Sequence, residues 1–179
     1  MNLHFRLLLM LLKSVFANKI SLLDESRVKY RVWPLDCDFN LHLTNSRYFS
    51  LCDVSRFYYM GQVGALFKLF KRKWLPVAQA QEISYFKPIY PFQQFDVVTR
   101  FTHWDEKYWY TEHQFFVAER LCAVVQVRGV FVHRRKVLPF HDVLAVVEEE
   151  VAVPDKPISV EYWQRLIESK KEFQKTGLQ

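Results

Sequence analysis

The stretch from Trp33 to Arg56 reads WPLDCDFNLHLTNSRYFSLCDVSR, and it is where the chain changes from strand to helix. Its first half is polar and begins at Pro34, which predicts a loop. Its second half follows three good N-cap residues at 44–46 and repeats apolar side chains at helical spacing. We therefore expect a long buried helix to begin there and to break near Gly61–Gly64.

The loop carries polar residues at alternate positions, just before the helix begins: Asp36, Asp38, Asn40 and His42. A helix start presents unpaired N–H groups and a positive dipole end, which can polarise a carbonyl group. A nearby carboxylate could then attack that carbonyl carbon or deprotonate a water molecule. In the simpler interpretation, Asp38 caps the loop, Asn40 satisfies backbone groups and His42 packs.

On either side of this segment the pattern is that of strands. Residues 27–33 alternate as RVKYRVW, and four later runs are rich in valine, phenylalanine and tyrosine, at 77–86, 95–104, 108–118 and 121–133. The short connections between these four runs predict an antiparallel meander. Past Pro139 the pattern becomes helical again, with an apolar stripe formed by Val160, Trp163, Leu166 and Ile167.

This order of elements predicts an α+β protein with a single sheet. A curved antiparallel sheet of about five strands, wrapped round the long central helix, would bury the helix and one face of the sheet. That arrangement is the hotdog fold. We expect an N-terminal helix within residues 1–24, the hotdog domain at 25–138 and a helical extension at 139–179.

Composition narrows the class of protein. The 179 residues are 50% apolar and 17% aromatic, which fits one well-filled globular domain. The formal charge of +6 favours anionic partners, but no basic block dominates, so nucleic-acid binding is not expected. The three cysteines lack metal-ligand spacing, so we expect neither a metal site nor a disulfide framework, and a reducing cytoplasm fits best.

The N-terminus, MNLHFRLLLMLLKSVFANKI, holds three cations and no acid. Its apolar run from Leu7 to Leu12 is too short to span a bilayer. Residues 1–20 therefore form either a helix packed on the domain or a peripheral membrane contact. Because the sheet and central helix have complete apolar faces, we expect the segment to be dispensable for the core. The expected location is cytoplasmic, with membrane association through this segment as the alternative.

The loop and helix start resemble those of hotdog-fold acyl-CoA thioesterases of the 4-hydroxybenzoyl-CoA thioesterase type, in the thioesterase-superfamily-member branch. Their DxD pair places the catalytic aspartate at Asp38. The segment is also similar to plant acyl-ACP thioesterases, whose D-x-N-x-H-x-N-N-x-x-Y stretch is matched at Asp38, Asn40, His42, Asn45 and Tyr48, with Thr44 in place of the first asparagine of the pair. A weaker Y-x-x-P match stands at Tyr85 and Pro88, followed by Asp96.

The resemblance implies hydrolysis of an acyl-CoA or acyl carrier protein thioester. Asp38 would act as base or nucleophile, Asn40 and His42 would orient it or the water, and Asn45, Ser46 and Tyr48 would bind the substrate. No cofactor is implied beyond coenzyme A as part of the substrate, and the partner is a second copy in a homodimer or larger oligomer. The alternative function is a noncatalytic hotdog module that binds acyl-CoA or a membrane surface. The basic segments around Lys71 and at 133–136 are either phosphate-binding sites or solvated surface.

Overall fold

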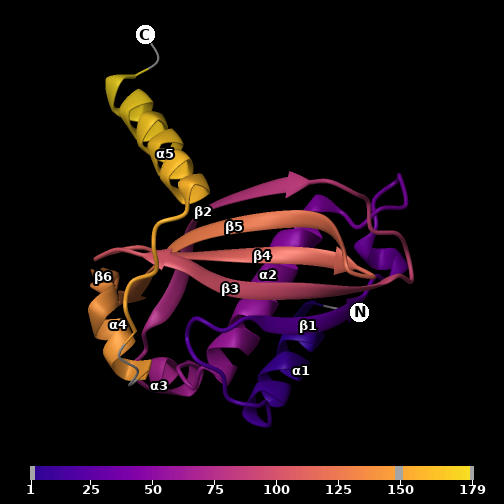
Figure 1. Ribbon diagram of the computed structural model, residues 1–179, viewed down its shortest axis with the longest axis horizontal. Helices are drawn as coiled ribbons and strands as arrows, with labels where there is room; N and C mark the ends of the chain where they lie inside the picture. Colours follow the sequence, from indigo (N-terminus) through magenta and orange to yellow (C-terminus); the bar gives the residue numbers. More distant parts are fainter. Residues whose placement is uncertain (1–2, 148–150, 178–179) are drawn as a thin grey trace.

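The computed structural model describes residues 3–147 and 151–177. Its centre is one antiparallel sheet with the strand order β1-β3-β4-β5-β2, and β6 pairs with β5 (Figure 1). The strands are β1 (Ser26–Arg31), β2 (Leu75–Tyr85), β3 (Gln94–Trp104), β4 (Trp109–Val117), β5 (Arg120–His133) and β6 (Lys136–Leu138). The sheet curls, so it has a concave face and a convex face.

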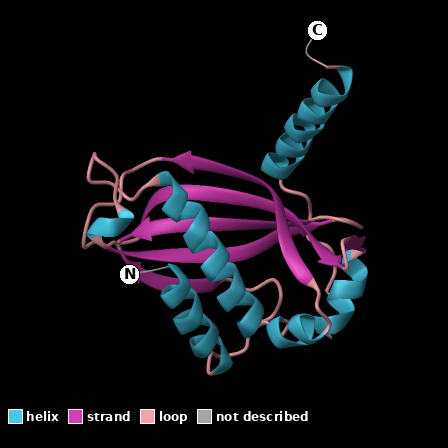
Figure 2. Ribbon diagram, turned by 180° about the vertical axis from the view of Figure 1, so that it is seen from behind, coloured by secondary structure: helices cyan, strands magenta, loops and turns pink. Residues whose placement is uncertain are grey.

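The concave face of the sheet covers the central helix α2 (Asn45–Gln62), and α1 (Leu3–Val15) lies beside α2 (Figure 2). Two short helices, α3 (Leu66–Lys71) and α4 (Phe140–Val147), lie at the far end of α2, and α5 (Ile158–Thr176) ends the chain. This arrangement confirms the predicted α+β hotdog fold. The predicted helix break is also present, because α2 ends at Gln62 and Gly64 adopts a left-handed φ of 81°.

The core lies between α2 and the inner side chains of the strands. Leu51, Cys52 and Tyr59 of α2 are fully buried, and so are Val97 of β3 and Phe115 of β4. Alternate residues of each strand point inward, which is why the period-two pattern predicted these strands. Burial of large side chains at about 25 cal/mol per Å² of apolar area is what holds helix and sheet together.

One prediction about strand order was wrong. The four later strands were expected to form a meander, but β2 pairs with β5 at the other side of the sheet and not with β3. The connection at residues 86–93 crosses the end of the curled sheet, and eight extended residues can reach about 26 Å. Only β3, β4 and β5 form the meander.

The N-terminal helix is packed on the domain, as one of the two interpretations held. Its buried face carries Arg6, Met10 and Ser14, one turn apart, and Gly61 of α2 lets the helices touch. A Cβ on Gly61 would lie 2.4 Å from Ser14 Cβ, a distance no packed pair tolerates. This packing argues against the expectation that the segment is dispensable, because its removal would uncover the face of α2 and leave Asp36 without Arg6.

The C-terminal helix α5 rests on the convex side of the sheet by its first turns and then projects away from the domain (Figure 1). Val160, Trp163 and Ile167 pack against Tyr110, whose hydroxyl accepts a 2.6 Å hydrogen bond from Gln164. The apolar stripe predicted for this helix included Leu166, and that part of the prediction was wrong, because Leu166 is 48% exposed. In the part of the chain that is described, no helix is both long and apolar enough to cross a membrane.

A candidate active site at the start of the central helix

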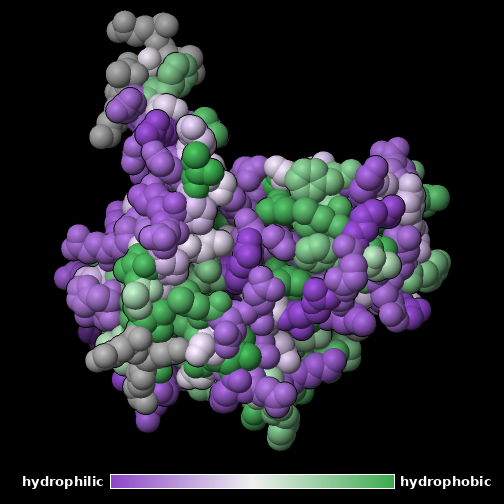
Figure 3. All heavy atoms as spheres, in the orientation of Figure 1, coloured by the Kyte–Doolittle hydropathy of each residue, from purple (hydrophilic) through white to green (hydrophobic). Residues whose placement is uncertain are grey.

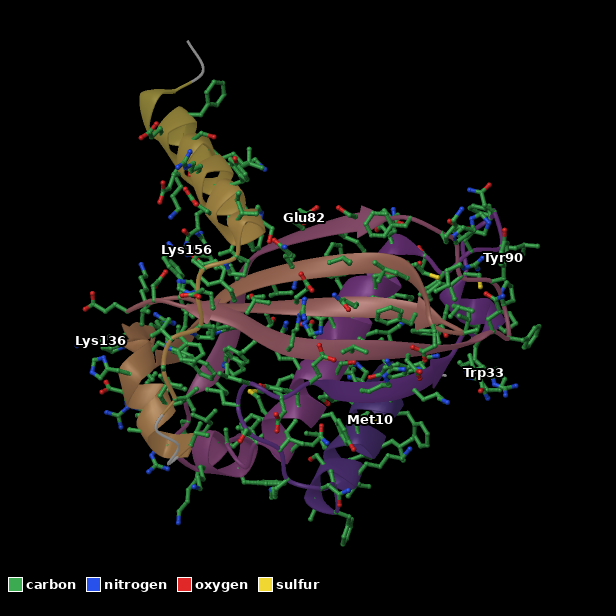
Figure 4. All side chains as sticks on the ribbon, in the orientation of Figure 1. Met10, Trp33, Glu82, Tyr90, Lys136 and Lys156 are labelled. Carbon is green, nitrogen blue, oxygen red and sulfur yellow. The ribbon has the colours of Figure 1, made fainter. Side chains whose placement is uncertain are left out.

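A cleft of about 330 Å³ opens where the loop after β1 meets the first turn of α2 and the end of β2. Figure 4 shows this end of the sheet, marked by Trp33 and Tyr90. Four of the six predicted site residues line the cleft, and two, Asn40 and Ser46, do not. The lining consists of Asp38, His42, Leu43, Asn45, Tyr48, Tyr85, Phe86, Lys87 and Pro88.

Asp38 is exposed, and its carboxylate is held by the loop's own backbone. Its Oδ1 atom accepts hydrogen bonds from the N–H groups of Asn40 at 2.9 Å and His42 at 3.2 Å. The peptide N–H of Asp38 donates to the carbonyl of His42 at 2.9 Å, which closes the loop. Both side-chain bonds go to Oδ1, so Oδ2 remains available for chemistry.

His42 lines the cleft without contacting the Asp38 carboxylate through its ring. The imidazole instead meets the edge of the Tyr90 ring, with centroids 5.1 Å apart. Asn40 contributes its backbone N–H to Asp38, and its side chain is exposed. The structure therefore brings these three predicted residues into one loop, with peptide groups making the bonds between them.

Sequence reasoning missed the residue that anchors this loop, Asp36. Its fully buried carboxylate pairs with Arg6 of α1 and with Arg47 of α2, whose Nε lies 3.2 Å from Oδ1. Oδ2 also accepts the Trp33 N–H at 3.0 Å, and the Asp36 carbonyl accepts the Thr44 N–H at 2.9 Å. One acid thus joins both ends of the loop to two helices. The DxD pattern was the only signal for it, because Arg6 lies thirty positions away.

The start of α2 faces the cleft with little capping. Thr44 is the N-cap and makes no side-chain hydrogen bond to the helix. Asn45 and Ser46 are exposed, and Asn45 lines the cleft. The first N–H groups of a helix lack partners within the helix, so this end can bind an oxygen that carries negative charge.

The inner wall of the cleft is aromatic. Tyr48 is 3% exposed and packs against Phe115 and Tyr85, with centroids 4.8 and 5.3 Å apart. Burial raises the pKa of the Tyr48 hydroxyl, which keeps it protonated at neutral pH. The thiol of Cys37 also has a raised pKa, because of burial and then the charges of Asp36 and Asp38, which disfavours a thiolate nucleophile.

A buried polar pair lies deeper between α2 and the sheet. His113 of β4 is fully buried, and its Nδ1 lies 2.9 Å from the Thr99 hydroxyl. Burial, and then the charge of Arg56, lower its pKa well below 6.5. The imidazole is therefore neutral in the folded protein, and it lies behind the cleft's aromatic wall, two residues from Phe115 on the same face of β4.

An apolar cavity of about 30 Å³ lies at the other end of α2, where α3 and α4 close the sheet. Its lining is almost wholly aliphatic and aromatic, and the Tyr59 hydroxyl already donates to the Leu22 carbonyl. This cavity offers no acid, base or nucleophile. The cleft beside Asp38, in contrast, is lined by a carboxylate, an imidazole and a phenol.

Comparison with known proteins gives one consistent result. Residues 32–147 match the model of the thioesterase-like superfamily. A probable thioesterase of Saccharomyces cerevisiae is 32% identical over 115 residues, which cover 62% of this chain and 50% of that protein. Protein THEM6 of Danio rerio is 30% identical over 152 residues, which cover 81% of this chain and 71% of that protein. The match therefore spans half the length of the yeast relative.

Solved structures agree on the fold. A probable thioesterase from Bartonella henselae superimposes with a TM-score of 0.60 at 17% identity, over 65% of this chain and 98% of that one.

Proposed function

Because the chain belongs to the thioesterase-like superfamily, we propose that it hydrolyses an acyl thioester of coenzyme A or acyl carrier protein to a free acid and a thiol. The observation that carries this proposal is the cleft in which an exposed carboxylate, Asp38, stands beside the uncapped start of α2. Acyl transfer to water needs a base or nucleophile and a group that stabilises the oxyanion, and we assign these roles to Asp38 and to the start of α2.

In the proposed reaction the thioester carbonyl lies at the helix start, where the N–H groups near Asn45 and Ser46 draw charge onto its oxygen. Asp38 takes a proton from a water molecule, whose oxygen bonds to the carbonyl carbon. The C–S bond then breaks, and the leaving thiolate takes the proton from Asp38. Asp38 can also attack directly, with water hydrolysing the resulting anhydride. Asn40 and His42 hold the carboxylate through their backbone N–H groups.

The acyl group would lie against the aromatic wall of the cleft. Tyr48, Tyr85 and Phe86 offer apolar area, and the protonated Tyr48 hydroxyl can donate a hydrogen bond to the substrate. Long-chain and aromatic acyl groups both suit such a wall. No metal or redox cofactor takes part in the proposed steps.

The proposal includes a homodimer. β2 forms one edge of the sheet, is eleven residues long and pairs only on its β5 side among the described residues. Leu75, Val77 and Tyr85 on this strand are 51%, 43% and 45% exposed. Figure 3 shows apolar side chains gathered on the visible face over β5 and the adjoining edge strand. Edge strands of this length are usually paired or covered, and a second copy would cover this one.

We further propose a cytoplasmic protein that touches a membrane through residues 1–20. The outer face of α1 carries exposed apolar side chains, and the segment has cations but no acid, which suits an anionic bilayer surface. These exposed residues are Phe5, Leu8, Leu12 and Val15, followed by Phe16 just beyond the helix.

The test of hydrolysis is release of free thiol from a panel of acyl-CoAs that spans short, long and aromatic acyl groups. Saturable release of thiol is the expected result. The other candidate is a noncatalytic module that binds acyl-CoA in the same cleft. The exposed apolar face of α1 favours this candidate, because such a face could attach the module to a membrane. Tight acyl-CoA binding without any thiol release would replace the enzyme by that module.

A further inference from the structure

The loop at 36–44, which carries Asp38, is closed like a hairpin, and Asp36 lies at its base. The N–H of Thr44 donates to the carbonyl of Asp36 at 2.9 Å, and an antiparallel β-bridge joins the next residue on each side. Beyond this bridge the N–H of Asp38 donates to the carbonyl of His42 at 2.9 Å. These backbone contacts run without a gap from the base of the loop to Asp38. The position of Asp36 therefore fixes the position of Asp38.

Asp36 is itself held by side chains from two helices. Its fully buried carboxylate pairs with Arg6 of α1 and with Arg47 in the first turn of α2. Arg47 belongs to the helix start that borders the cleft, so its ion pair ties the loop to that start. Arg6 reaches the same acid from the opposite end of the sequence. Figure 2 shows the first turn of α1 next to the short helix η1 (Pro34–Asp36), which ends in this acid.

Arg6 has no second acid to pair with. Its side chain is 3% exposed, and among the described residues Asp36 is the one carboxylate within ion-pair distance of it. A buried guanidinium is costly without such a partner, so the pair should be kept in the folded protein. Arg6 also lies outside residues 32–147, which match the family model. The contact thus joins the hotdog domain to a segment that the family model does not include.

The position of the loop matters because the proposed reaction has two parts on different elements. The carboxylate of Asp38 belongs to the loop, and the N–H groups that stabilise the oxyanion belong to the start of α2. Both must meet the same carbonyl group. A displacement of about 1 Å can lower the rate of such a reaction by about 100-fold. Whatever holds the loop against the helix start therefore contributes to kcat.

We propose that Arg6 is a positioning residue for thioester hydrolysis, because through Asp36 it holds Asp38 at the correct place beside the start of α2. The proposal rests on the proposed hydrolysis by Asp38, and it needs no second subunit. No residue of α1 is among those that line the cleft. The N-terminal helix thus contributes to catalysis without contact with the substrate.

The first test compares two changes on the same buried face of α1. Arg6→Gln removes the cation, and we expect kcat to fall by about tenfold or more while KM changes by less than about twofold. The control is Met10→Ala, one turn further along the helix, where an uncharged side chain is 6% exposed in the apolar core. This change also destabilises the protein but should leave kcat unaltered. Both variants are assayed at a temperature at which circular dichroism shows them to be folded.

The second test asks whether Arg6 acts through Asp38. In the Asp38→Asn background, adding Arg6→Gln should lower the residual kcat by less than about twofold, because the carboxylate that Arg6 positions is already absent. A general loss of structure would instead lower kcat by the same factor in both backgrounds. The comparison therefore separates a positioning role from a merely structural one.

A third variant keeps the charge. Arg6→Lys places the cation on a shorter side chain with a single nitrogen, so kcat should lie between the values for the wild type and Arg6→Gln. If Arg6→Gln does not fold, Arg6→Lys replaces it in both tests, with kcat expected to be at least about threefold below the wild-type value.

The outcomes separate this proposal from the proposed hydrolysis. An equal loss of kcat in both backgrounds, or the same loss in Met10→Ala, overturns the positioning role. If the wild type releases no thiol, the hydrolysis fails, and hydrogen exchange decides whether Arg6 positions the loop. The backbone N–H groups of Asp38 and Thr44 should then exchange at least about tenfold faster in Arg6→Gln than in Met10→Ala. Equal exchange rates in the two variants would overturn the positioning itself.

Discussion

The Oδ1 atom of Asp38 lies 3.2 Å from the backbone nitrogen of His42, so the peptide group, and not the ring, of the histidine holds this carboxylate. In the described residues no hydrogen bond joins the carboxylate to the imidazole. The two residues that the sequence motif pairs are thus joined through the backbone of His42, and their two side chains make no bond to each other. Their roles can therefore be separated by mutation.

Asp38→Asn should keep the fold and lower kcat by about 100-fold or more, because an amide can neither take the proton nor attack the carbonyl. The asparagine oxygen still accepts the two backbone bonds, so the loop stays closed. Steady-state kinetics on the best acyl-CoA provides the measurement, with Asp142→Asn on α4 as an exposed control. Wild-type kcat in the Asp38 variant would remove this residue from the mechanism.

His42→Ala should lower kcat by less than about tenfold and act mainly on KM, because the ring lines the cleft and packs on Tyr90 without contacting the carboxylate. The two kinetic constants measured separately decide the matter. A loss of kcat as large as that of Asp38→Asn would instead make the imidazole an essential base.

Arg6→Gln should destabilise the protein by about 3–5 kcal/mol, because it leaves the buried Asp36 carboxylate with Arg47 as its remaining cation. Adding Asp36→Asn should recover part of this loss, since no buried charge then lacks its partner. Urea unfolding of the two single variants and the double variant measures the coupling. If the loss of unfolding free energy in the double variant equalled the sum of the two single losses, Arg6 and Asp36 would not act as a unit.

Stability should fall as the pH drops below about 6.5, in part because of His113. Burial and then Arg56 depress the pKa of this imidazole, so below the unfolded value the unfolded chain binds a proton that the folded chain does not. The free energy of unfolding then falls by up to about 1.4 kcal/mol per pH unit.

His113→Gln should flatten this slope of unfolding free energy against pH between pH 6.5 and 5. His141→Gln, at a side chain 72% exposed, should leave it unchanged. Equal slopes in the wild type and His113→Gln would contradict the assignment.

Light scattering at micromolar concentration should give about twice the 21.6 kDa of one chain. Val77→Lys on the edge strand β2 should shift the mass toward a single chain, because it places a charge in the pairing surface. Leu23→Lys is the matched control, since both residues are 43% exposed and Leu23 precedes β1 at the opposite edge. A wild-type mass near one chain would rule out the dimer.

Much of this architecture follows from local sequence. The alternation in each long strand and the N-cap residues at 44–46 predicted where strands and helix lie, and the motif predicted which loop forms the cleft. The position of β2 beside β5 did not follow, because periodicity specifies a strand but not its partner. The link from Arg6 to Asp36 was missed for a related reason, since it joins residues thirty positions apart. β6 was missed because three residues carry no periodic pattern.

The pairing proposed for the edge of β2 would also make stability depend on how much protein is present. If two copies pair along this strand, folding and association are linked, and each tenfold dilution lowers the free energy of unfolding by about 1.4 kcal/mol per dimer. The melting temperature would then rise with concentration, and a chain expressed at very low level would be the least stable form of the molecule. Dilution would act on this protein as a mild denaturant.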